Sequence, residues 1–189
     1  MVGLYIFVGI LAAVLIWQLA VWVWEIHYKN RQSNAAVAYS RIQNKPLLVA
    51  GGPWGGRPLR RRLKMPAHVM GDVSIDIISS AVEGHPNGIV ATVTKLPFPD
   101  KTFGSALASH LLEHLYDTNE AKQAMAELSR VADSVYIAYP TRQSLAAWII
   151  PDHRLWVWQK DGTVYLKQRR GRGLPSPVEY YKLNDGKKI

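Results

Sequence analysis

The sequence predicts an α/β domain with a parallel sheet, preceded by one apolar helix long enough to cross a membrane. Two observations support this prediction. Residues 4–24 contain no charged side chain. From Lys45 onward, apolar runs of strand length alternate with short helical or irregular segments. The sequence has no internal repeat, and the part beyond residue 44 is close to the usual size of one hydrophobic core.

The apolar segment at residues 4–24 supplies about 20 apolar positions, enough for a bilayer core of roughly 30 Å. Gln18 is its only strongly polar residue. A secretory signal peptide would carry basic residues before the apolar run and a small-residue cleavage site after it, and this segment has neither. We therefore expect a retained anchor, with the buried helix of a soluble protein as the alternative.

The residues flanking the anchor predict its orientation. Lys29 and Arg31 follow it, whereas residues 1–3 offer only the α-amino charge. Because basic residues favour the cytoplasmic side, we expect a single-pass membrane protein whose main domain is cytoplasmic. The absence of cysteine is compatible with a reducing compartment and excludes thiolate metal sites. The expected domains are an anchor (1–24), a helical stalk or linker (25–44) and an α/β domain (45–189).

The formal net charge of +9 lies entirely beyond the anchor. On an anchored domain, clustered basic residues favour anionic lipid headgroups or an acidic membrane-protein partner. Nucleic acid is less expected because no base-reading motif accompanies the charge, and a solvated face is the simplest alternative. The two basic runs are formed by Arg57, Arg60, Arg61, Arg62 and Lys64, and by Lys167, Arg169, Arg170 and Arg172.

Residues 96–114 hold the most informative pattern. Pro97 and Pro99 exclude helix and favour a tight turn. The apolar run that follows predicts a buried strand at Phe103–Ser109. Polar residues resume where this strand would reach the carboxyl edge of the sheet, which is where open α/β sheets bind ligands.

A helix is predicted next, from about residue 118 to residue 131, because apolar residues recur there at helical spacing. Asp117 or Asn119 would cap its first turn. Residues 134–139 then read as a further strand, ended by Pro140.

Residues 96–114 read Leu-Pro-Phe-Pro-Asp-Lys-Thr-Phe-Gly-Ser-Ala-Leu-Ala-Ser-His-Leu-Leu-Glu-His. This stretch resembles the class I S-adenosylmethionine (SAM)-dependent methyltransferases, specifically their type 11 branch. In that branch a Leu-Pro-Phe turn leaves the third strand, and Ser-His-x-Leu-Glu-His closes the fourth. The resemblance implies a Rossmann-like SAM-methyltransferase sheet and SAM as the cofactor.

The resemblance also implies where the cofactor would bind. A glycine-rich turn after the first strand lets backbone approach the cofactor, and Gly51, Gly52 and Gly55 stand there. An acid at the end of the second strand would accept hydrogen bonds from ribose hydroxyls. Asp72 is the first choice for this acid and Asp76 the second, and turn capping is the alternative role for Asp72. The remaining expected cofactor contacts are Thr92, Leu96 and Ser109.

The chain departs from the family pattern at several of these positions. Val49 stands where the family has an acid in the first strand, and Pro53 replaces the middle glycine of the turn. Thr92 replaces the acid that would meet the adenine amino group, and Gly104 replaces an Asp. Each lost charge-assisted partner would weaken SAM binding, at about 1.5–3 kcal/mol each.

His110, Glu113 and His114 also match the H-x-x-E-H pattern of zinc peptidases, in which two histidines bind zinc and the Glu is the base. This match begins at a strand end, as the methyltransferase pattern requires, and no third ligand follows at a recognisable spacing. We therefore expect no metal site. His110 is the first candidate for a general base, with a structural histidine as its alternative.

His153 is the second catalytic candidate. It lies between Asp152 and Arg154, after the fifth strand, where members of this family build substrate contacts. An Asp-His pair can orient a base, and a loop salt bridge is the alternative. The Asn-Pro-Pro-Tyr-like signature of amino-group methylation is absent, which argues against methylation of nucleic-acid bases.

Two functions follow from these patterns. The first is a membrane-anchored SAM-dependent methyltransferase that acts on a small or lipid-soluble substrate at the cytoplasmic face. The second is a catalytically inactive methyltransferase fold that serves as an accessory or scaffolding subunit of a membrane complex, because a fold does not by itself carry its family's activity.

Overall fold

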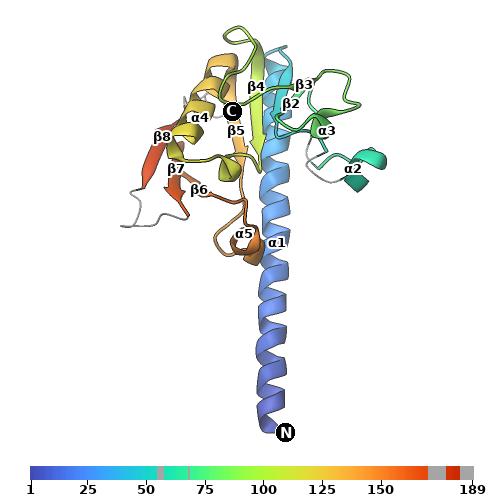
Figure 1. The fold of residues 1–189 in the computed structure, drawn as a ribbon, viewed down its shortest axis with the longest axis vertical. Coiled ribbons are helices and arrows are strands. Elements are labelled where there is room, and N and C mark those ends of the chain that lie inside the picture. Colours follow the sequence, from blue (N-terminus) through green and yellow to red (C-terminus); the bar gives the residue numbers. More distant parts are fainter. Residues whose placement is uncertain (55–57, 68, 170–177, 184–189) are drawn as a thin grey trace.

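The computed structural model describes residues 1–54, 58–67, 69–169 and 178–183. Its centre is a five-stranded parallel sheet in the order β3-β2-β1-β4-β5 (Figure 1). This parallel sheet is the α/β arrangement that the sequence predicts. Its strands are β1 (Leu47–Ala50), β2 (Val73–Asp76), β3 (Gly88–Val90), β4 (Phe103–Ser109) and β5 (Ala132–Ala138).

A second, antiparallel sheet lies beside the first and is built from three strands in the order β6-β7-β8. Its strands are β6 (Leu155–Lys160), β7 (Thr163–Gln168) and β8 (Glu179–Lys182). The helices are α1 (Val2–Ile42), α2 (Pro58–Arg62), α3 (Ser79–Val82), the short 3-10 helix η1 (Leu112–His114), α4 (Thr118–Val131) and α5 (Leu145–Ile149).

The strand and helix that follow the Pro-Phe-Pro turn are confirmed. All residues of β4 are buried, as expected for a central strand covered on both faces. Helix α4 begins after Asp117, whose Oδ1 accepts a hydrogen bond from Glu120 N at 2.8 Å and so caps the first turn. Its buried face includes Met125 and Leu128, both of which are fully enclosed in the main core.

The turn that begins at Leu96 is clamped onto α4 by two charged side chains. Glu127 Oε2 accepts from Leu96 N at 2.8 Å, and Arg130 Nη2 donates to Leu96 O at 3.0 Å. Arg130 Nη1 also donates to Phe98 O and to Asp100 Oδ1. The hydrogen bonds from Arg130 hold the pKa of the Glu127 carboxyl below its usual value. The turn at residues 96–98 therefore has a structural role, because it is bonded to α4 and packs at the main core.

The two faces of the sheet bury different partners. Leu47, Val49 and Leu107 pack with Ala36 of α1 in one cluster. Leu48 and the rest of the main core face α4, β6 and β7. This alternation along β1 is what a strand buried on both faces requires, because successive side chains point to opposite sides.

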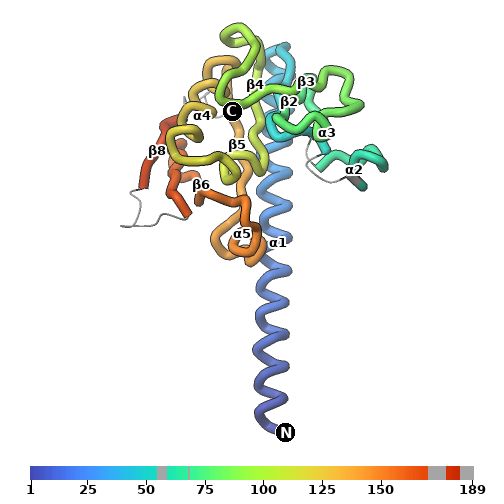
Figure 2. The backbone as a smooth tube through the Cα atoms, in the orientation of Figure 1, coloured from blue at the N-terminus to red at the C-terminus, as the bar shows by residue number. Residues whose placement is uncertain are grey.

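Helix α1 is unbroken from the apolar segment into the domain, as the tube in Figure 2 shows. Its C-terminal part packs on the sheet through the small residues Ser33, Ala36 and Ser40, all buried. Ser105 Oγ of β4 donates to Ala36 O at 2.7 Å and lies 2.6 Å from Ser40 Oγ. One face of residues 33–40, within the segment expected to be a stalk or linker, therefore packs against the domain.

The N-terminal part of α1 extends away from the domain (Figure 1). In the part of the chain that the structure describes, α1 is the one helix long and apolar enough to cross a membrane. Only 6% of its most apolar window is buried by the rest of the protein, whereas the core helix of a soluble protein would be mostly covered. This observation favours the anchor over the buried-helix alternative.

The packing of α1 on the sheet predicts that Ala36→Leu lowers the free energy of unfolding by about 1–3 kcal/mol, because the larger side chain overpacks the contact with β1 and β4. Ala38→Leu, at an exposed position of the same helix, is the matched control and should change stability little. Chemical unfolding of the detergent-solubilised full chain measures both. Equal effects of the two variants would mean that residues 25–42 only link the anchor to the domain.

Candidate functional site

A pocket of about 320 Å³ lies at the carboxyl ends of β1 and β2. We call it the strand-end pocket. Ligands of open α/β sheets bind at this edge, and a volume at the lower end of the usual range of about 300–1,000 Å³ suits a small ligand. Among the residues that line it are Gly51, Asp76, Thr92, His114, Tyr116 and Arg154.

The glycine-rich turn closes β1 at the pocket. Gly51 and Gly52 have φ of +109° and +67°, and both N–H groups donate to Ile75 O at 3.0 Å. Gly51 lines the pocket, and a Cβ there would lie 3.1 Å from Ser109 O. Gly52 packs instead against α3, where a Cβ would lie 2.7 Å from Ala81 O. Gly55, the third glycine of the expected turn, lies outside the described residues.

The acid at the end of the second strand is Asp76, and the first choice, Asp72, is wrong in position. Asp72 precedes β2, at the opposite edge of the sheet, where its Oδ2 accepts from Leu47 N at 2.7 Å. Asp76 ends β2 and lines the pocket, and its Oδ1 accepts from Ile78 N at 2.8 Å. Burial raises the pKa of the Asp76 carboxyl, although its backbone hydrogen bonds oppose this effect.

The other expected cofactor contacts are only partly brought together. Thr92 is exposed and lines the pocket. Ser109 is buried at the end of β4, with its carbonyl next to Gly51. Leu96 was also expected to contact the cofactor. Its side chain is instead buried in the main core and does not line the strand-end pocket.

His110 and Glu113 form a close pair at the end of β4. His110 has a φ of +51°, and its Nδ1 lies 3.3 Å from Glu113 Oε1. Glu113 is only 1% exposed, and among the described residues neither of its carboxylate oxygens has a hydrogen-bond partner. Burial raises the pKa of this carboxyl, but His110 and His114 outweigh it and hold the pKa below its usual value.

Glu113 is thus a buried carboxylate anion. Moving such a group out of water costs on the order of several kcal/mol unless charges and hydrogen bonds compensate for it. Its backbone O accepts from Arg154 N at 2.7 Å, which ties η1 to the segment that precedes β6.

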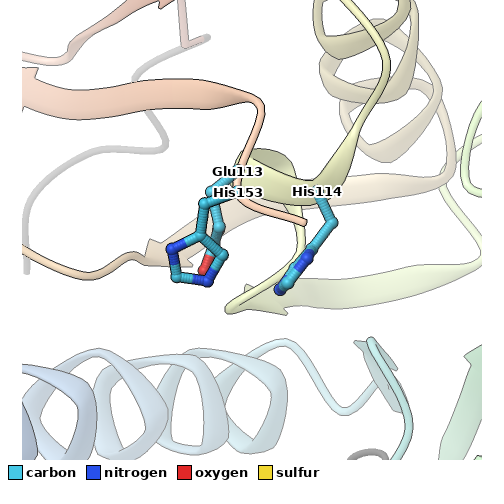
Figure 3. Close-up of side chains that lie close together, drawn as sticks. All are labelled: Glu113, His114 and His153. Atoms are coloured by element: carbon cyan, nitrogen blue, oxygen red, sulfur yellow. The ribbon is translucent and has the colours of Figure 1, made fainter. Parts of the chain in front are cut away.

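His153 lies beside this pair, a contact that sequence spacing did not reveal. Its ring packs edge-on against that of His114, with ring centroids 4.8 Å apart. The ligand atoms of Glu113, His114 and His153 all lie within 4.8 Å of one another (Figure 3). We call these three residues the His-Glu-His cluster. Burial lowers the pKa of the His153 imidazole, with the Glu113 charge opposing this shift.

The outer wall of the pocket carries groups that the sequence analysis did not assign. The Arg154 guanidinium lies 5.2 Å from the centre of the Tyr116 ring, a cation–π distance. Both residues line the pocket together with His114. In the sequence, the one indication of Tyr116 and Arg154 is that they follow His114 and His153 closely in the chain.

The family described as "Methyltransferase domain" matches residues 57–134, which is less than half of the chain. This segment runs from α2 to β5 and includes Asp76, Thr92 and the His-x-x-Glu-His stretch. Residues 57–134 are therefore similar to the methyltransferase-domain family. No curated protein matches the chain significantly.

Three solved structures are similar to this chain. A protein from Pyrococcus horikoshii OT3 is 18% identical, with 82% of this chain and 76% of that chain covered and a TM-score of 0.42. The SAM-bound amino pentose methyltransferase CalS10 from Micromonospora echinaspora is 12% identical, with the same coverages and a TM-score of 0.40.

The N-methyltransferase NodS from Bradyrhizobium japonicum WM9, in complex with S-adenosyl-L-homocysteine, is 11% identical, with 76% of this chain and 81% of that chain covered and a TM-score of 0.38. Such low scores carry no argument about function.

The close approach at Gly52 leads to a stability prediction. Gly52→Ala should destabilise the fold by more than Gly84→Ala, because both positions have positive φ but only Gly52 lies against backbone, at Ala81 O. Positive φ alone costs about 1–2 kcal/mol for an L-residue, and this is the loss expected for Gly84→Ala. Chemical unfolding of both variants measures the difference. Equal losses would show that the turn does not press on α3.

Proposed function

We propose that this chain is a SAM-dependent methyltransferase held at a membrane by α1, which transfers a methyl group to a small or lipid-soluble substrate at the cytoplasmic face. The observation that carries the proposal is the strand-end pocket, in which the Gly51 turn and the Asp76 carboxylate meet at the carboxyl edge of a methyltransferase sheet.

The residues of the pocket fit SAM in their chemistry. Asp76 offers a carboxylate for the ribose hydroxyls, and Gly51 allows backbone to approach the cofactor without a side chain between them. SAM supplies a methyl group on a positively charged sulfur. The chain's own contribution is to hold and orient the two reactants, and His114, Tyr116 and Arg154 on the outer wall are placed to contact the methyl acceptor.

The SAM site is tested by calorimetry on the detergent-solubilised full chain. Asp76→Ala should weaken SAM binding by about tenfold to a hundredfold, the loss expected for a charge-assisted hydrogen-bond acceptor. Asp72→Ala is the matched control and should leave the affinity unchanged, because Asp72 lies at the opposite edge of the sheet.

Two results would contradict this proposal. If the wild-type protein binds neither SAM nor its demethylated product at millimolar concentration, the methyltransferase function fails and the accessory-subunit hypothesis becomes the better one. If SAM binds but Asp72→Ala weakens it more than Asp76→Ala, the ribose site has been placed at the wrong edge.

The contacts between α1 and the segment before α5 support the membrane location. Gln18 Nε2 donates to Gln143 O at 3.0 Å, and Gln18 Oε1 accepts from Leu145 N at 2.9 Å. Gln18 lies inside the expected span at residues 4–24, about 9 Å of helix before its end. Figure 1 shows α5 beside α1 at this level, and in our proposal this is where the domain meets the bilayer boundary.

Helix α5 presents apolar side chains at this level. Trp148 is 57% exposed and Ile149 is 73% exposed, and exposed apolar groups on a short amphipathic segment favour the headgroup boundary. Arg169 donates to Ala147 O and to Trp148 O, which holds the helix against the second sheet. We include α5 in the proposal as a second, peripheral contact with the membrane.

The basic residues after the glycine-rich turn support contact with anionic headgroups. Arg60, Arg61 and Arg62 belong to α2, and Lys29 Nζ of α1 donates to Ala67 O at 2.8 Å, which ties this segment to α1. Lys29 is about 8 Å of helix beyond the expected end of the span at Trp24, a distance at which basic side chains are attracted to anionic lipid.

The absence of native cysteine permits a clean test of the membrane location. A fluorophore on Ile149→Cys, in vesicles of mixed neutral and anionic phospholipid, should be quenched by lipids with shallow spin labels, because α5 lies at the bilayer boundary. The same fluorophore on Asn119→Cys, exposed on α4, is the control and should be quenched only by a water-soluble quencher.

Equal quenching of the two labels by the water-soluble quencher would contradict the proposed contact of α5 with the membrane. The orientation is tested with Asn119→Cys in intact cells. A membrane-impermeant thiol reagent that modifies it there would contradict the cytoplasmic location.

A further inference from the structure

We propose that the His-Glu-His cluster is a binding site for a divalent transition-metal ion, with Zn²⁺ as the best match to its donors. The site consists of one carboxylate, from Glu113, and two imidazoles, from His114 and His153, and their ligand atoms all lie within 4.8 Å of one another. This inference does not depend on the proposed function, since methyl transfer from SAM does not itself require a metal.

The observation that points to a cation is the state of Glu113. Its side chain is 1% exposed, and beyond the contact of Oε1 with His110 Nδ1 at 3.3 Å, neither carboxylate oxygen has a hydrogen-bond partner within the described part of the chain. Figure 3 shows the Glu113 and His153 side chains overlapping in the view, with the His114 ring next to them. A buried carboxylate is normally satisfied by hydrogen bonds, an ion pair or a metal. A cation held between Glu113 and the two imidazoles would satisfy it.

The geometry needs only a small adjustment. Ligand atoms around a tetrahedral zinc with bonds of about 2.0–2.1 Å lie about 3.3–3.5 Å apart, so a separation of 4.8 Å must shorten by roughly 1.3–1.5 Å. Glu113 and His153 are buried, and the bond from Arg154 N to Glu113 O holds their segments together. His114 is exposed and can supply the movement.

The donor set selects the class of metal. Two imidazoles and one carboxylate are ligands that zinc uses in open sites, whereas Mg²⁺ and Ca²⁺ prefer oxygen donors throughout. His110 Nδ1, 3.3 Å from Glu113 Oε1, is placed to orient the carboxylate, as outer-shell partners of metal ligands do. We assign His110 as a positioning residue of this site.

The location of the cluster gives the metal access to a ligand. His114 also lines the strand-end pocket, so a metal bound to it lies at the wall of that pocket. Three protein ligands leave one position of a tetrahedral zinc open, and a water molecule or an oxygen atom of a ligand in that pocket can occupy it.

Metal binding to the full chain, free of any affinity tag and solubilised in detergent, tests this inference without SAM. After treatment with a chelator, the protein should take up one equivalent of Zn²⁺ in competition with a chromogenic chelator. It should also give the visible absorption of a tetrahedral site when titrated with Co²⁺. Glu113→Gln and His114→Ala should each weaken Zn²⁺ binding at least about tenfold, because loss of even an outer-shell partner typically costs about tenfold to a hundredfold.

His27→Ala is the matched control, because His27 is an exposed histidine of α1 far along the chain from the cluster, and it should bind Zn²⁺ as the wild type does. His114→Ala replaces an exposed side chain and keeps the test valid if Glu113→Gln fails to fold. Zinc should raise the unfolding temperature of the wild type and of His27→Ala only. Absence of Zn²⁺ uptake at micromolar concentration, or unchanged affinity in His114→Ala, would overturn the assignment.

Discussion

The structure depends on one unbroken helix, α1, whose two parts have different environments. Its N-terminal part is apolar and uncovered, and its C-terminal part covers one face of the parallel sheet through Ala36 and Ser40. Because the helix is unbroken between the two parts, the packing of α1 on β4 and β5 sets the angle of the sheet to the N-terminal part of α1. The contact of Gln18 with the segment before α5 reinforces that angle.

The fold was predictable wherever local patterns decide it. The all-apolar strand at Phe103–Ser109 and the amphipathic helix with its Asp117 cap agree with the structure because both signals are contained in a few consecutive residues. Residues 25–44 were misjudged because their buried face consists of small residues, Ser33, Ala36 and Ser40. These follow helical spacing but carry little hydrophobicity, so a search for apolar periodicity passes over them.

The site was less predictable, because it depends on strand register and on contacts between distant segments. Gly71 and Asp72 resemble a strand end, yet β2 begins only at Val73, so the acid at the end of this strand is Asp76. The approach of His153 to Glu113 joins two segments about 40 residues apart, and no spacing rule announces it. The sequence indicated most of the side chains of the site, but which of them contact one another depends on the tertiary structure.

The packing of α1 also explains two of the departures from the family pattern. Val49 is buried in the cluster with Ala36 and does not line the strand-end pocket. At Gly104 a Cβ would lie 2.9 Å from Ser40 Cα, so a larger residue there would push α1 off the sheet. These two substitutions follow from docking the helix closely and are no evidence that SAM binding is lost. The departures that bear on the pocket itself are Thr92 and the Pro53 turn. The case for or against catalysis therefore depends on how well Asp76 and the backbone at Gly51 compensate for those two.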